Sequence, residues 1–154
     1  MLRITTLMFT TVLAAGALTA CATDQSSPID DSEPSPHIQT AQQLAAYMQT
    51  TPNSPLSHLA PEARQRFADS MVFSTDGLAS YRYSDLQELS ATEIYHILRL
   101  FDVEGTTPLI SKARVSTDSD KAVMNIIVGG YPDMWCSSRA TCSSQLGSTC
   151  TDNC

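Results

Sequence analysis

Apolar and polar residues between His37 and Val128 recur with a helical period over most of this length. The clearest helix spans residues 90–101, "SATEIYHILRLF". Ser90 and Glu93 have the spacing of a capping box, in which each side chain accepts a hydrogen bond from a free backbone N–H of the first turn. The apolar side chains recur at i, i+3, i+4 and i+7 and are Ile94, Ile97, Leu98 and Phe101. One face of this helix is therefore expected to pack on a core.

The same periodicity predicts further short helices in the rest of this region. They fall within residues 37–49, 60–73, 106–115 and 117–128. A turn signal at Asp76-Gly77, followed by the tyrosine-rich stretch Leu78–Tyr83, leaves room for a short β-hairpin. The predicted fold class is mainly α: a small helical domain of four to five short helices with a disulfide-rich C-terminal tail. The expected centre of the core is Phe67, Met71, Ile94, Ile97, Leu98, Phe101, Ile126 and Ile127.

The first twenty residues have the pattern of a secretory signal peptide. Arg3 is followed by an uncharged run, Ile4 to Ala20, which ends in small residues. The stretch "LTAC", which ends at Cys21, resembles the lipobox of bacterial lipoproteins. The resemblance implies that the signal is cut before Cys21 and that the thiol of Cys21 is lipidated. Because Ala22 rather than Asp follows, it also implies an outer-membrane destination.

The chain divides into four regions by composition. Residues 1–20 are the signal peptide, and residues 21–36 are polar, acidic and proline-rich. The second region cannot bury a core and is expected to be a disordered, lipid-anchored tether. Residues 37–130 form the expected helical domain, and residues 131–154 form a four-cysteine tail.

Four of the five cysteines lie in the tail, and they remain to pair if Cys21 carries lipid. They are Cys136, Cys142, Cys150 and Cys154. Their x5, x7 and x3 spacings do not fit the C-x2-4-C knuckles of structural zinc sites. Export also places these thiols in an oxidising compartment. The sequence therefore predicts two disulfides and no metal. Of the three pairings, Cys136–Cys150 with Cys142–Cys154 is preferred, because its interleaved loops tie the whole tail together.

The net charge and the sequence motifs argue against several classes of function. The formal charge of −7 leaves no electrostatic footprint for nucleic acid and disfavours anionic membrane surfaces, so membrane attachment is expected through the lipid at Cys21. No G-x-S-x-G, H-E-x-x-H or P-loop motif occurs. Glu93 and His96 have the E-x-x-H spacing of di-iron bundles, but no second such pair is present. We interpret Glu93 as a helix cap, Asp118 and Asp120 as first-turn helix acids, and the chain as a non-enzyme without a cofactor.

Two stretches carry a resemblance to a family. They are "FADSMVFSTDGLASYRYSDLQELSATEIYHILRLFDVEGTTPLI" and the ending "TCSSQLGSTCTDNC". They resemble the bacterial proteins called bacteriocin fulvocin C-related, over Leu59 to Cys154. The resemblance implies an antibacterial role and supplies no catalytic residues. Asp102 departs from the expected pattern, because a glycine ending the helix is expected there.

Two functional hypotheses follow. The first is an exported, lipid-anchored envelope protein that acts as a non-enzymatic binding module for an unknown protein or envelope partner. The second is a bacteriocin or its precursor, cut at Gly129-Gly130 to release residues 131–154. That peptide would carry Asp133 and Asp152 against Arg139, so it would lack the cationic charge that attracts a peptide to anionic lipid. The glycine pair is alternatively a helix cap and turn.

Overall fold

The computed structural model describes residues 35–127 and 129–154, and its fold is a mixture of helix and sheet. The predicted signal peptide, Cys21 and most of the predicted tether lie outside the described residues. Helix accounts for 38% and strand for 24%, so the prediction of a mainly α fold is wrong. The elements are α1 (Ala41–Thr50), the 3-10 helix η1 (Pro55–His58), α2 (Pro61–Asp69), β1 (Val72–Ser74), β2 (Gly77–Arg82), α3 (Ala91–Arg99), the 3-10 helix η2 (Glu104–Leu109), α4 (Asp118–Met124), β3 (Tyr131–Ser138) and β4 (Thr141–Cys150).

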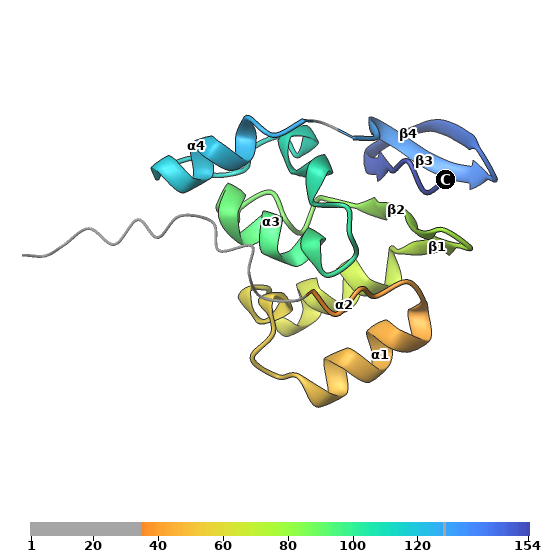
Figure 1. Ribbon diagram of the computed structural model, residues 1–154, viewed down its shortest axis with the longest axis horizontal. Coiled ribbons are helices and arrows are strands. Elements are labelled where there is room, and N and C mark those ends of the chain that lie inside the picture. The colour runs from red at the N-terminus through yellow and green to blue at the C-terminus, as the bar shows by residue number, and fades with distance from the viewer. Residues whose placement is uncertain (1–34, 128) are drawn as a thin grey trace, which may run out of the picture.

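The strands form one antiparallel sheet with the order β1-β2-β4-β3. The hairpin of β1 and β2 turns at Thr75-Asp76, and Gly77 of the predicted turn signal is the first residue of β2. The hairpin of β3 and β4 occupies the predicted tail and is the element that sequence analysis missed. β4 pairs with β2 through Ser80 opposite Cys150, so the C-terminal hairpin completes the sheet of the domain. Figure 1 shows this sheet at one end of the molecule and α4 at the other.

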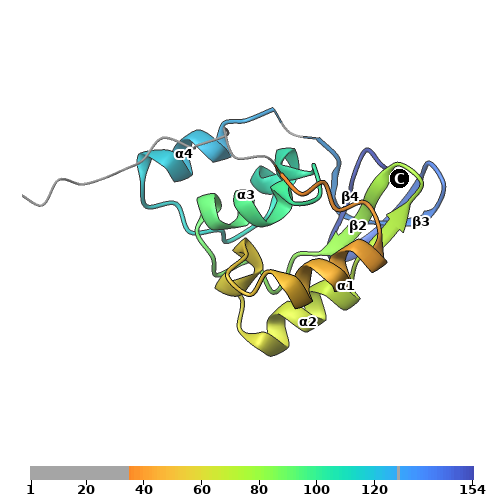
Figure 2. The same cartoon turned by 60° about the horizontal axis from the view of Figure 1, so that its bottom comes forward.

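The predicted capping box at the start of α3 is confirmed. The Ser90 hydroxyl accepts from the backbone N–H of Glu93 at 3.2 Å, and the Glu93 carboxylate accepts from the backbone N–H of Ser90 at 2.8 Å. α3 lies between α4 and the sheet, while α1 and α2 lie side by side along another side of the molecule (Figures 1 and 2). In the described part of the chain, no helix has the length and apolar character that crossing a membrane requires.

The main core forms where α3 meets α1, α2 and the sheet. Its buried side chains include five of the expected residues: Phe67, Ile94, Ile97, Leu98 and Phe101. Met71 and Ile126 are partly buried. Ile127 is 94% exposed, so its place in the predicted core is wrong. The reason is that α4 ends at Met124, which leaves Ile127 outside the helix whose apolar face was extrapolated to include it.

Asp120 joins α4 to α3 and does more than the first-turn acid that the sequence suggested. It is 2% exposed, and its carboxylate accepts from the backbone N–H and the hydroxyl of Thr92, at 3.0 and 2.8 Å. The backbone N–H groups of Ser116 and Thr117 donate to it as well, both at 3.0 Å. Burial by itself raises the pKa of a carboxyl group, but these donors outweigh it and hold the pKa of Asp120 far below its usual range.

Candidate functional site

The C-terminal hairpin owes its shape to a sharp bend in β4. Pro132 pairs with Thr149, and Met134 pairs with Ser144, so residues 145–148 bulge out of the ladder between them. Gly147, inside the bulge, has φ +78°. The bend returns β4 toward its own beginning, so that residues 142 and 150 lie only 6.1 Å apart between Cα atoms. The predicted four-cysteine tail is therefore a hairpin with a bulged strand.

Asp133 fixes the bulge to the rest of the domain. Its carboxylate accepts from the backbone N–H of Gly147 at 2.9 Å and from the hydroxyl of Tyr83 at 2.7 Å. The backbone N–H of Tyr83 in turn donates to the carbonyl of Gly147 at 2.9 Å. The Tyr83 hydroxyl and the Gly147 N–H stabilise the ionised form and hold the pKa of Asp133 below its usual range. The bulge is thus a connection between the hairpin and the segment just after β2.

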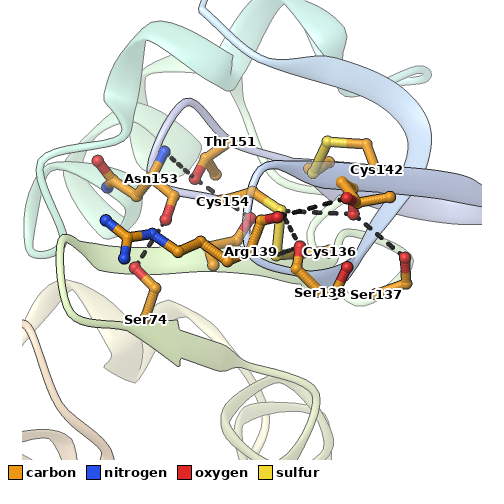
Figure 3. The surroundings of a disulfide bond; sticks show 12 residues. Ser74, Cys136, Ser137, Ser138, Arg139, Cys142, Thr151, Asn153 and Cys154 are labelled. Carbon is orange, nitrogen blue, oxygen red and sulfur yellow. Dashed lines mark hydrogen bonds between the residues drawn. A yellow bond between two sulfur atoms is a disulfide. The ribbon is translucent and has the colours of Figure 1, made fainter.

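Two disulfides join the four tail cysteines, as predicted, but the preferred pairing is wrong. The structure pairs Cys136 with Cys154 and Cys142 with Cys150, so that one bridge is nested inside the other. The bend in β4 brings Cys142 to Cys150. After β4 the chain turns back, and the N–H of Ala140 donates to the carbonyl of Cys154, which places Cys154 beside Cys136 (Figure 3). The spacing of the cysteines in the sequence predicts neither the bend in β4 nor the turn that follows it.

The tail is docked by backbone pairing and by a small core of its own. The backbone N–H of Thr151 donates to the carbonyl of Ala79 at 2.9 Å, and the hydroxyl of Ser74 donates to the carbonyl of Asn153 at 2.6 Å. Figure 3 shows Ser74 reaching Asn153 beside the outer disulfide. The buried members of the small core are Ala79, Cys136 and Cys150. The cysteines therefore supply the apolar packing that the serine- and threonine-rich tail lacks.

Gly129-Gly130 lies where the chain enters the sheet. Gly130 has φ +87°, and a Cβ there would stand 2.6 Å from the carbonyl oxygen of Cys150. The backbone N–H of Gly130 donates to Asp152 at 3.2 Å, and that of Gly129 donates to the carbonyl of Gly105 at 3.3 Å. The sequence predicted a helix cap and a turn at these two glycines. The turn is present, but α4 ends at Met124, so the glycines do not cap it. Close packing explains the glycine pair without a cleavage signal.

We expect Gly130→Ala to destabilise the domain by about 2–3 kcal/mol, and Gly147→Ala by only about 1 kcal/mol. Both residues have positive φ, but a Cβ at Gly147 would meet nothing within 4 Å. The difference between the two losses of unfolding free energy measures the clash between a Cβ at residue 130 and the backbone of β4. Chemical denaturation of the two variants measures it, and equal losses would show that the close approach at Gly130 has no energetic weight.

Among the described residues, one group of side chains has the spacing that a metal site requires. The sulfur atoms of Cys136, Cys150 and Cys154 lie within 4.8 Å of one another, but each belongs to a disulfide and is not available as a thiolate. Glu93 is the helix cap that the sequence predicted and also lies 3.3 Å from Nδ1 of His58. The helix cap therefore explains why a glutamate stands three residues before His96, without a metal site.

Family models, curated proteins and solved structures were each compared with this chain, and none matches it. The resemblance to bacteriocin fulvocin C-related proteins stays a prediction that rests on the motifs quoted above. The features that bear on the function of this chain are therefore those of its own structure, above all the way the C-terminal hairpin is joined to the sheet.

Proposed function

We propose that this chain is an exported, lipid-anchored envelope protein whose folded domain acts as a non-enzymatic binding module. The observation that carries the proposal is the pairing of β4 with β2, because it makes the cysteine-rich segment part of the domain. Cys150 and Thr151 are both buried at this junction. A segment meant for release would not be expected to supply an interior strand. The lipobox resemblance at Cys21 supports the anchor, whereas the antibacterial role that the fulvocin C-related motifs imply belongs to the second candidate below.

The second candidate, a bacteriocin precursor, has one observation in its favour. Both disulfides lie within residues 131–154, so a peptide released after Gly130 would keep them. Against it, cleavage would remove β4 from one edge of β2 and expose Ala79, which is fully buried in the small core with Cys136 and Cys150. Exposing such side chains costs about 25 cal/mol for each Å² of apolar surface. We therefore favour the intact module.

Lipidation at Cys21 is the part of the proposal that a single measurement decides. We expect mass spectrometry of the mature protein to show an acylated cysteine as its first residue, and membrane fractions to contain the protein. Cys21→Ser should abolish both, because serine offers no thiol for the lipid. Ala22→Asp is the matched control, since it should keep the acylation and shift the protein to the inner membrane. An unmodified N-terminus that begins elsewhere would refute the anchor.

A further inference from the structure

A polar pocket lies between the C-terminal end of α1, the loop that contains η1, and the last turn of α3. It encloses about 440 Å³, a volume within the range of small-molecule sites. Tyr47 and Thr51 line it from α1, and His96 and Arg99 line it from α3. Ser35, the first described residue, closes one side and donates its hydroxyl to the backbone carbonyl of Arg99 at 2.6 Å. Residues 53–58 form the remaining wall.

The lining of this pocket is basic although the chain as a whole is acidic. His58, His96 and Arg99 are among its lining residues, and the described residues that line it include no Asp or Glu. The nearby carboxylate of Glu93 is already engaged by Ser90, by His58 at 3.3 Å and by Arg114 at 3.4 Å. Arg99 brings a positive charge to this lining and the histidine rings can add N–H donors, so in a chain of net charge −7 the lining favours an anion.

We propose that this pocket binds a phosphate group, and the inference rests on the proposed binding function, for which it names the ligand class. The planar guanidinium of Arg99 can donate two parallel hydrogen bonds to phosphate oxygens. Hydroxyl groups from Tyr47, Thr51 and Ser57 surround the same space and can donate to the remaining oxygens. Several donors around several basic groups suit a phosphate, with its three free oxygens and up to two charges, better than a carboxylate. Tyr47, His96 and Arg99 already interact within the chain, so the phosphate would exchange with existing contacts.

The phosphate can come from a soluble small molecule or from a lipid headgroup. With a lipid at Cys21, residues 22–34 could extend at most about 45 Å before the chain reaches Ser35 at the pocket. The pocket would therefore stay near the bilayer, where phosphate groups are concentrated. The same three basic residues would recognise either source.

Titration of the purified full chain with glycerol 3-phosphate, followed by calorimetry, tests the proposal. A second arm measures cosedimentation with phosphatidylcholine vesicles that contain or lack phosphatidic acid. We expect saturable binding in at least one arm. Glycerol 3-phosphate binding identifies a soluble ligand, whereas binding only to vesicles with phosphatidic acid identifies a headgroup.

Arg99→Gln is expected to weaken this binding about tenfold to a hundredfold, because it removes the charged donor but keeps a similar length. Arg99→Lys should retain part of the affinity, since it keeps the charge and loses the fork. Arg64→Gln on α2 removes the same charge away from the pocket and should bind as the wild type does, with unchanged melting as the check on folding. No binding in either arm, or equal binding by Arg99→Gln and Arg64→Gln, would overturn the phosphate site. Neither result would affect the acylation of Cys21, which tests the proposed function separately.

Discussion

Replacing all four tail cysteines by serine is expected to lower the thermal midpoint of the domain by at least about 10 °C. The outer bridge, Cys136–Cys154, closes a loop with a sequence separation of 18, and the inner bridge, Cys142–Cys150, one of 8. Chain-entropy arguments give about 3 kcal/mol for a loop of the larger size. The nested inner bridge adds less, because the outer one already restricts the segment. For a domain of this size, each kcal/mol shifts the midpoint by several degrees.

The effect should reach the whole domain because β4 is an interior strand. If the tail were only appended, its loss of order would leave the melting of α3 and the main core unchanged. Thermal unfolding followed by far-ultraviolet circular dichroism measures the helices directly. Cys21→Ser serves as the control, since it also removes a thiol but touches none of these bridges. A helix signal that melts at the wild-type temperature in the four-serine variant would contradict the docking of the hairpin.

Deleting residues 131–154 is expected to abolish cooperative folding. The deletion removes β3 and β4 together, and it leaves the backbone of β2 without the partners of Ser80, Tyr81 and Arg82. It also removes most of the small core around Ala79, including two of its three buried members. The truncated chain should lack a sharp thermal transition and should aggregate through its open strand edge. Calorimetry and size-exclusion chromatography measure these two outcomes.

The same deletion separates the two functional candidates. Adding a synthetic, disulfide-bonded 131–154 peptide to the truncated chain should restore part of the transition if the hairpin belongs to the sheet. The binding-module proposal expects this peptide to leave a sensitive bacterial strain unharmed. The precursor hypothesis expects the reverse: a truncated chain that melts as sharply as the intact one, and a peptide recovered from cells that kills a neighbour.

Local sequence was sufficient for α3 and for the approximate places of α1, α2 and α4. The helix predicted over 60–73 instead ends at Asp69 and gives way to β1, and the one predicted within 106–115 is the 3-10 helix η2. α3 is specified within a dozen residues, because its capping box and its apolar stripe both depend on neighbours no more than one or two turns away. Five of the eight expected core residues are buried, and these five lie on α2, on α3 or directly after α3. The prediction failed at Ile127, where the apolar period continued beyond the residue at which the helix ends. Asp120 was assigned to the correct turn, but its bonds to Thr92 cross between two helices and could not be inferred from spacing.

The sequence by itself determined α3, the approximate places of the other α-helices and the presence of four cysteines that can pair, and it carries the expectation of export with a lipid at Cys21. Only the tertiary structure decided that the last segment is a hairpin and which cysteines it joins. The physical reason is distance along the chain: Ser80 and Cys150 pair across 70 residues, so the place of the hairpin in the sheet depends on a strand that lies far away in the sequence. The bulge held by Asp133 then brings Cys142 to Cys150, so the disulfide pairing is a consequence of the fold rather than of the spacing.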